Sequence, residues 1–380
     1  MALTGNRGEW AEIYIFLKLM YDRVVYAADK DMNKIDDVFL KIIEIIREEH
    51  KNRVYVYKTG DKVHIFLNNS FTGIEIDDYV FLEKQEYLLD LMSVNKRGNF
   101  SDYDMEEFLS LIQITKLKAP AVKSNTYFGG TQDITLSVVD PRSGVNQTIG
   151  FSCKSDFAGR ATLFNASKNN TNFIYEITGD INDSIMSETN GIFRKRKDKL
   201  DIAIGDRIRF LKEAGCDIEF VSTSQVNAER NLVLSGGIEF PSILGEALKY
   251  YFWIGEGSVK YAPISQAIDY VIENNPAKYK YNDIYSVYRK KFSDLLYNMF
   301  TGMRLGASWD GKSSVNGGYI VMKDDGDVLA YHSCITDEFK EFLLNRLGFE
   351  SPSASRHEYL DVYKENGKYY INLNLQIRFI

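Results

Sequence analysis

Residues 132–154 read QDITLSVVDPRSGVNQTIGFSCK, and this stretch decides the fold expected for the chain. Apolar and polar residues alternate on both sides of a Pro-Arg-Ser-Gly turn, which is the pattern of a β-hairpin. With the turn centred just after Ser143, Asp133 stands opposite Lys154 at the open end of the hairpin. Ser152 shares a face with Lys154, because side chains two apart on a strand point the same way. The hairpin therefore predicts that Asp133, Ser152 and Lys154 converge on one spot.

Apolar side chains would bury the opposite face of this hairpin. They are Ile134, Leu136, Ile149, Phe151 and Cys153. An aspartate and a lysine on paired strands are more often a solvated ion pair, so their spacing alone identifies no site. Three functional groups along the polar edge of a hydrophobic sheet favour a catalytic role instead.

A carboxylate at the end of one strand and a lysine on the next is the arrangement of metal-dependent nucleases of the PD-(D/E)XK type. Asp133 and a backbone carbonyl on the second strand would hold Mg²⁺ against the scissile phosphate. Lys154 would orient or deprotonate the attacking water and offset the charge that develops on the phosphate. Ser152 occupies the place of the usual second acid and would contribute a hydrogen bond near the phosphate. Another carboxylate is therefore needed for the metal.

The first predicted helix supplies a candidate for that carboxylate. Apolar residues recur at three- and four-residue steps from 8 to about 22, which predicts an amphipathic helix. Its start, Gly-Glu-Trp-Ala-Glu, has the Gly-x-x-x-Glu form found in many nucleases of this type, so Glu12 is predicted to reach the metal. From the residues alone, an exposed glutamate favoured by the helix dipole is an equally good interpretation. Glu9 and Glu176 are the other candidates.

Polar side chains suited to DNA follow Lys154 directly. Arg and Lys pair with guanine edges, Asn pairs with adenine, and any of them can contact phosphate. A Ser/Asn-rich run is ordinarily a surface loop, and its position beside the predicted catalytic lysine is what makes it a candidate. The basic run RKRKDK at 194–199 is a further candidate for phosphate contacts. The predicted DNA-binding residues are Arg160, Asn165, Ser167, Lys168 and Asn169, together with Arg356 in the segment SPSASRH at 351–357.

The remainder of the chain predicts a mixed α/β protein. Residues 53–67 alternate and turn at Thr-Gly-Asp, which predicts a second hairpin. A division at Ser-Gly-Gly, near 235–240, separates a nuclease core at 1–237 from a C-terminal recognition region at 238–380. Residues 39–46 are apolar enough for a helix or a buried strand, and we favour a helix. Helices are also expected near 84–94, 104–114, 198–214, 243–253, 265–274, 283–300 and 337–347.

Composition excludes several classes of protein. The 46 Lys and Arg against 53 Asp and Glu give a net charge of −7, which excludes a histone-like binder but not local phosphate contacts. The three cysteines and four histidines are scattered, so a disulfide framework or a zinc site is not expected. No apolar run approaches the roughly 20 residues of a membrane span, and the first residues lack the layout of a signal peptide. We expect a cytoplasmic protein with no membrane partner.

Three segments resemble the HpaII family of type II restriction endonucleases in order and spacing. They are GNRGEWAEIYIFLKLM near the start, DITLSVVDPRSGVNQTIGFSCKSDFAGRATLFNASKNNTNFIYEI in the middle and SPSASRHEYLDVYKENGKYYINLNLQIRF at the end. The resemblance is essentially full length. It implies a mixed α+β, PD-(D/E)XK-like core flanked by helices, with Mg²⁺-dependent cleavage of double-stranded DNA at a short palindrome to leave 5′-phosphate ends. It also implies a cognate DNA methyltransferase that acts on the same site.

Asp133 and Lys154 match the motif of that nuclease type, whereas Ser152 departs from it and leaves the remaining metal ligand open. CCGG, the site of the family's type member, is a candidate target, although target sites diverge among relatives. Two alternatives stay open. A sequence-specific DNA-binding protein with a degenerate core would fit the serine at 152, and a structure-specific nuclease would fit the Gly-x-x-x-Glu start. A palindromic target predicts a homodimer with one active site per strand.

Overall fold

The chain divides into two compact units. Unit 1 comprises Met1–Ala161 and Ser314–Phe342, and unit 2 comprises Thr162–Ser313 and Leu343–Ile380. The predicted boundary at 237 therefore falls inside unit 2, because the chain leaves unit 1 and returns to it much later. The computed structural model describes residues 3–96, 98–118, 132–155, 162–196, 199–256, 261–312, 317–332 and 336–380.

Unit 1 is built on a nine-stranded mixed sheet, in the order β1-β15-β14-β7-β6-β2-β3-β4-β5. The predicted hairpin is β6 and β7, and it lies in the middle of this sheet, with β7 also parallel to β14. The two late strands β14 and β15 complete a sheet begun by the N-terminal strands. The strands are β1 (Val24–Ala28), β2 (Lys34–His50), β3 (Arg53–Lys58), β4 (Lys62–Leu67), β5 (Ser70–Asp77), β6 (Ile134–Val139), β7 (Asn146–Ser155), β14 (Gly318–Met322) and β15 (Val328–His332).

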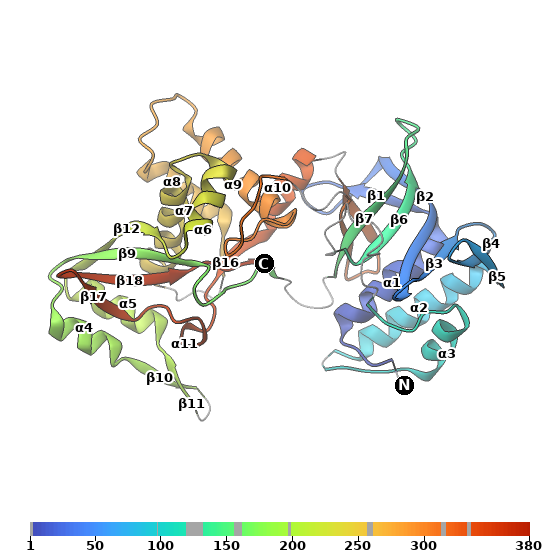
Figure 1. Cartoon of the computed structure of the whole chain (residues 1–380), viewed down its shortest axis with the longest axis horizontal. Coiled ribbons are helices and arrows are strands. Elements are labelled where there is room, and N and C mark those ends of the chain that lie inside the picture. The colour runs from blue at the N-terminus through green and yellow to red at the C-terminus, as the bar shows by residue number, and fades with distance from the viewer. Residues whose placement is uncertain are drawn as a thin grey trace. The chain divides into compact units, whose positions relative to one another are not determined.

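Helices α1 (Arg7–Asp22) and α2 (Asp78–Val94) cover the sheet of unit 1. Helix α1 packs on β7 and β2, and α2 packs on α1 (Figure 1). The side chain of Asn6 accepts hydrogen bonds from the first turn of α1 while Glu9 bonds back to the Asn6 N–H, and this capping box sets where α1 begins. The predicted helix over 8–22 and the predicted burial of one hairpin face are confirmed. The apolar residues of α1, β6 and β7 share one core, which includes Trp10, Ile13, Phe16, Leu136, Phe151 and Cys153.

The prediction of a helix at residues 39–46 is wrong, because these residues belong to the long strand β2. That strand pairs with β1, β6 and β3 along its length. The stretch FLKIIEII is apolar in both the helical and the strand periods, so periodicity alone could not separate them. Its β-branched isoleucines fit a strand with neighbours on both sides. The hairpin expected over 53–67 is present as β3 and β4.

Unit 2 contains two four-stranded sheets, β12-β9-β18-β17 and β13-β16-β19-β8, and a hairpin of β10 and β11. Helices α5, α6 and α7 pack on β12. No described helix has both the length and the apolar character needed to cross a bilayer. The strands are β8 (Thr162–Phe164), β9 (Asn172–Gly179), β10 (Phe193–Arg196), β11 (Lys199–Ile202), β12 (Cys216–Thr223), β13 (Tyr261–Pro263), β16 (Leu347–Glu350), β17 (Val362–Glu365), β18 (Lys368–Asn374) and β19 (Ile377–Phe379). Across both units, the helices other than α1 and α2 are α3 (Tyr103–Leu111), α4 (Asp183–Asn190), α5 (Ile204–Glu213), α6 (Val226–Gly236), α7 (Phe240–Lys249), the π-helix η2 (Tyr250–Ile254), α8 (Ile264–Asn274), α9 (Ile284–Phe300), α10 (Thr336–Arg346) and α11 (Ala354–His357). The mixed α+β class predicted from the sequence is thus confirmed.

A buried ion pair joins β2 to the segment after α3. Arg47 and Glu49 have side chains only 2% and 1% exposed, and the Arg47 Nε donates to Glu49 Oε1 at 2.8 Å. Arg47 also donates to the Lys116 carbonyl at 2.9 Å. Glu49 Oε2 accepts from the N–H and hydroxyl of Thr115, at 2.8 and 2.9 Å. These bonds hold the segment 115–118 against the sheet.

We expect Arg47→Met to lower the free energy of unfolding by roughly 3–5 kcal/mol, because it leaves Glu49 buried without its cation. Chemical denaturation of purified protein measures this loss. Arg53→Met is the matched control, since Arg53 is exposed on the neighbouring strand β3 and its guanidinium donates to the Tyr55 hydroxyl rather than to a buried carboxylate. Equal losses in the two variants would contradict the role assigned to the buried pair.

Candidate active site

Asp133 lies immediately before β6, and its carboxylate faces β7. Its Oδ2 accepts a hydrogen bond from the Ser152 hydroxyl at 2.8 Å and one from the Cys153 backbone N–H at 2.8 Å. Lys154 Nζ in turn donates to Ser152 Oγ at 3.2 Å. The structure thus brings together the three hairpin residues that the sequence predicted to converge.

The register of the hairpin differs by two residues from the predicted one. The strands pair so that Asp133 lies opposite Ser152 rather than Lys154. The turn closes through the Asp140 N–H, which donates to the Val145 carbonyl at 3.2 Å, and it is centred one residue earlier than expected. The convergence survives this shift because Ser152 and Lys154 lie on the same face of β7.

Lys154 is also in contact with an aromatic ring. Tyr319 on β14 lies next to Ser152 in the parallel pairing of β14 with β7. The Lys154 ammonium lies 5.6 Å from the centre of the Tyr319 ring, within cation–π range. Ser152 and Tyr319 together limit the positions that the lysine can take, so its ammonium is held at the open end of the hairpin.

Glu12 on α1 shares the electrostatic environment of this cluster. Its Oε2 is buried and has no hydrogen-bond partner among the described residues. Burial, reinforced by the negative charge of Asp133, raises the pKa of Glu12 to about 8, although the positive charges of Lys118, Arg47 and Lys154 act in the opposite direction. A buried carboxylate oxygen without a partner is costly unless a cation or donor reaches it. This oxygen is therefore the best indication of a metal position in the site.

The donor set of Asp133 and Glu12 fits Mg²⁺. Both supply hard carboxylate oxygens, and Mg²⁺ is usually bound through one or two carboxylates while it keeps several waters. Within the described ranges, no three or more His, Cys, Asp or Glu side chains gather into a metal cluster. Two carboxylates and non-protein ligands are thus the arrangement that these residues can offer.

The other two candidates for the second carboxylate already have partners. Glu9 accepts from the Asn6 N–H at 2.9 Å as part of the helix cap, and its other oxygen lies 3.6 Å from Lys118 Nζ. Glu176 lies on β9 in unit 2 and accepts from Lys368 at 2.8 Å. Of the three candidates, Glu12 is the one with a buried oxygen that has no hydrogen-bond partner among the described residues.

The predicted DNA-binding residues 165–169 follow β8 in unit 2, whereas Arg160 lies outside the described residues. The Ser167 hydroxyl accepts from Asn170 Nδ2 at 2.9 Å, so it stabilises its own loop. Lys168 forms an ion pair with Glu358. Asn169 accepts from the Ser224 hydroxyl through its backbone carbonyl at 2.6 Å. Asn165 is exposed, and its side chain has no hydrogen bond to the described part of the chain.

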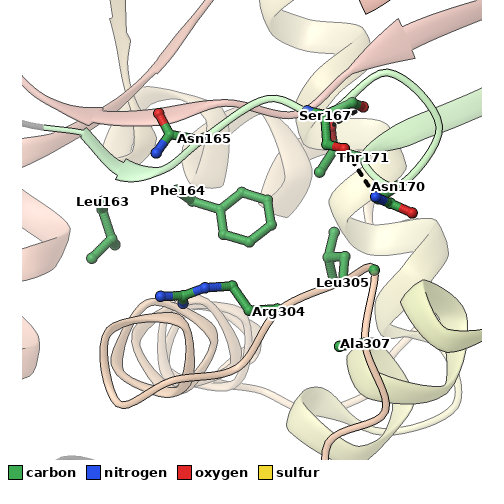
Figure 2. A pocket seen from close by; sticks show the side chains of 10 residues that line it. Leu163, Phe164, Asn165, Ser167, Asn170, Thr171, Arg304, Leu305 and Ala307 are labelled. Carbon is green, nitrogen blue, oxygen red and sulfur yellow. Dashed lines mark hydrogen bonds between the residues drawn. The ribbon is translucent and has the colours of Figure 1, made fainter. Parts of the chain in front are cut away.

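Two pockets in unit 2 meet at Asn165. The first, which we call the Arg304 pocket, has a volume of about 250 Å³. In Figure 2 the Arg304 guanidinium points toward the end where Leu163 and Asn165 lie, and Phe164 forms a wall. The second, which we call the Glu350 pocket, has a volume of about 430 Å³ and contains the predicted residue Arg356. Its other lining residues are Asn165, Ala166, Glu350, Ser351, Pro352, Ser353, His357, Gln376 and Arg378.

The pocket residues that the sequence did not predict are Arg304, Glu350, Gln376 and Arg378. Arg304 and Glu350 come from distant segments, and no local pattern marks them. Gln376 and Arg378 are two apart in NLNLQIRF, so strand alternation could have placed both on one face. Of the basic run, residues 194–196 lie on β10 and Lys199 begins β11, while residues 197 and 198 lie outside the described residues. Arg194 lies 3.9 Å from Asp201.

Comparison with known proteins gives one consistent result. The chain matches the family model described as HpaII restriction endonuclease over residues 6–379. It is 30% identical over 381 residues to the type II restriction enzyme HpaII of Haemophilus parainfluenzae, and the match covers 99% of each chain. No solved structure matches the chain. The similarity runs through both units, so it includes the hairpin cluster as well as the two pockets.

We expect Glu12→Gln to change the pH dependence of stability in metal-free buffer. Glu12 titrates near 8 in the folded chain against an ordinary 4.5, so the unfolded chain releases this proton first as the pH rises. The stability that wild type gains from the protonated carboxyl is complete below 4.5 and is lost as the pH approaches 8. Wild type should therefore lose stability relative to the variant across this window, and the difference should level off above it.

Denaturant unfolding from about pH 5 to about pH 9, with a chelator present, measures this difference. Glu9→Gln is the control, since the Glu9 carboxylate is already partnered at the helix cap. A difference between wild type and Glu12→Gln that does not vary with pH would contradict a raised pKa for Glu12.

Proposed function

Because the chain belongs to the HpaII restriction endonuclease family, and is thus a type II site-specific deoxyribonuclease, we propose that its catalytic centre is the cluster of Asp133, Glu12, Lys154 and Ser152. The substrate would be double-stranded DNA carrying a short palindrome, with 5′-phosphate and 3′-hydroxyl ends as products. The observation that supports this most strongly is the unpartnered, buried oxygen of Glu12 in the field of Asp133 and Lys154.

Asp133 and Glu12 would hold Mg²⁺. The ion, when bound, supplies a Lewis acid that polarises the scissile phosphate and lowers the pKa of a coordinated water. Asp133 is prepared for this role because the Cys153 N–H and the Ser152 hydroxyl both donate to one oxygen, Oδ2. Its other oxygen accepts no hydrogen bond from the described residues. Glu12 would bind as the carboxylate, so metal binding near neutral pH would displace its proton.

Lys154 would orient the attacking water and neutralise charge on the phosphate. Its ammonium has three N–H donors, and the bond to Ser152 uses one of them. The remaining donors can reach water and phosphate oxygen. The water oxygen would form a bond to phosphorus as the bond from phosphorus to the 3′ oxygen breaks, and the 3′ oxygen would take up a proton.

There is a physical reason for a serine at position 152, where nucleases of this type usually have an acidic residue. A third carboxylate beside Asp133 and Glu12 would add repulsion to a pair of like charges that already interact. The serine hydroxyl instead donates to Asp133 and accepts from Lys154, which links the two catalytic groups without adding charge. This interpretation, together with the family membership, argues against a DNA-binding protein with a degenerate core and against a structure-specific nuclease.

We further propose that unit 1 is a PD-(D/E)XK-like core that cleaves and that unit 2 recognises DNA. Asn165 and Arg356 are the best placed of the predicted contacts, because both line pockets and neither side chain is bonded to the described residues. Ser167, Lys168, Asn169 and Arg160 are the remaining proposed contacts. CCGG is a candidate target, protected in the host by a methyltransferase that acts on the same site.

Digestion of long unmethylated DNA tests the catalytic assignment. We expect discrete fragments that require Mg²⁺ and disappear with EDTA, and Lys154→Ala and Asp133→Asn should each slow cleavage by roughly 10²–10⁴-fold. Lys62→Ala, an exposed lysine on β4 of the same sheet, is the matched control and should cut at the wild-type rate. Intact DNA in every lane, or undiminished cutting by Lys154→Ala, would contradict the assignment.

A palindromic target should be bound by two copies of the chain. Two-fold symmetry then presents one catalytic centre to each strand. Light scattering on a complex with one short duplex should give a protein mass of about twice 43.6 kDa. A complex of one chain per duplex would rule out the homodimer and indicate sequential nicking.

A further inference from the structure

The Glu350 pocket has a charged floor built on paired strands. Glu350 ends β16, and Gln376 and Arg378 lie at the neighbouring strand β19, with which β16 pairs. The Glu350 side chain is only 8% exposed. Arg378 Nη1 lies between the two carboxylate oxygens, 3.1 Å from Oε1 and 2.9 Å from Oε2. Oε2 also accepts from Gln376 Nε2 at 2.7 Å. The floor is therefore a carboxylate fixed in place by two donors on a rigid sheet.

This carboxylate can still accept another hydrogen bond. A carboxylate offers about four lone-pair sites, and the bonds from Arg378 and Gln376 do not use all of them. Arg378 is itself held by a second bond, from its Nε to the Thr162 hydroxyl at 2.9 Å. An acceptor that is buried, oriented and not saturated is suited to recognise a ligand that carries N–H groups.

The mouth of the pocket offers a free cation. The Arg356 side chain is exposed and has no bond to the described residues, and its backbone N–H is bonded to the Ser353 hydroxyl at 3.4 Å. Burial and the charge of Arg356 lower the pKa of His357, so this imidazole is neutral near pH 7. Pro352 also lines the pocket, and its carbonyl accepts a hydrogen bond from the Tyr359 hydroxyl at 2.7 Å.

These charges indicate which ligand the pocket suits. A phosphate at the floor would face the Glu350 carboxylate and be repelled, whereas the same phosphate at the mouth would pair with Arg356. A planar group with N–H donors beside acceptors would bond Glu350 and also the donors of Gln376 and Arg378. The edge of a nucleobase that carries an exocyclic amino group has this pattern.

We infer that the Glu350 pocket reads one base of the target, with Glu350 accepting a hydrogen bond from an exocyclic amino group and Arg356 contacting the adjoining backbone phosphate. This assignment rests on the proposed function, since it requires DNA to be the substrate. It makes Glu350 a specificity-determining residue in unit 2, separate from the residues that hold the metal in unit 1. Gln376 and Arg378 are positioning residues that hold its carboxylate.

The test combines protein variants with base analogues. After the cleavage site has been mapped from fragment ends, each amino-bearing base in turn is replaced in a short duplex by an analogue that lacks the amino group. Hypoxanthine replaces guanine, purine replaces adenine and 2-pyrimidinone replaces cytosine. At one position, wild type should lose roughly tenfold or more in kcat/KM, and Glu350→Gln should lose less on the same replacement, because its neutral amide has a single acceptor oxygen and bonds the amino group more weakly.

Three further variants separate the reading of a base from folding and from phosphate binding. Glu350→Asp keeps the charge beside Arg378 but withdraws it from the pocket, so it should show the same loss of dependence on the amino group. Glu365→Gln, on the exposed β17 hairpin of the same unit, should behave as wild type at every position. Arg356→Ala should weaken binding to all the duplexes equally and reduce its salt dependence.

The inference is overturned if every analogue lowers the rates of wild type and of Glu350→Gln by the same factor. It is also overturned if cleavage by wild type is insensitive to removal of every amino group in the site. Wild type that cuts no DNA at all would instead refute the proposed function, so the two failures are distinguishable.

Discussion

The geometry of the candidate site in unit 1 depends on the bonds that the Asp133 carboxylate makes at the open end of the β6–β7 hairpin. One oxygen accepts from the Ser152 hydroxyl and from the Cys153 N–H. These two bonds hold the carboxylate at the end of β6, where it would otherwise be free to turn into solvent. They also leave the second oxygen of the carboxylate for a cation, and they align Lys154 through the shared serine. Asp133 thereby connects the central strands of the sheet with the proposed catalytic groups at the end of these strands.

The buried carboxylates of the protein differ in how many hydrogen-bond and ion-pair partners they have. Arg47 and Glu49 neutralise one another inside the protein and hold the segment that carries Lys118. Glu12, by contrast, is left with a buried oxygen and a raised pKa. The contrast between a buried carboxylate with several partners and one without a partner among the described residues supports the proposal that Glu12 binds a ligand. In unit 2 the Glu350 carboxylate is intermediate, since it is held by two donors but still able to accept.

Local sequence patterns were sufficient for the parts of the fold that are themselves local. The alternation in 132–154 and the helical period after Gly8 both led to elements that are present, and the convergence of Asp133, Ser152 and Lys154 was predicted from strand geometry. The register was two residues off, because the bonding inside the turn at Asp140 decides it. The sequence of residues 39–46 fits either a helix or a strand. The extended form is favoured by the pairing of β2 with three other strands, which no local pattern reveals. The return of the chain to unit 1 and the approach of Glu350 to Asn165 are tertiary events without a local signal.

The most direct test of the central claim is an anomalous diffraction experiment on Lys154→Ala crystals with cognate duplex and Mn²⁺ in place of Mg²⁺. The account predicts an anomalous peak bonded to oxygens of both Asp133 and Glu12, at roughly 2.0–2.2 Å, with the phosphate backbone beside it. A bound duplex with the metal held by other residues, or with Glu12 outside its coordination shell, would contradict the account.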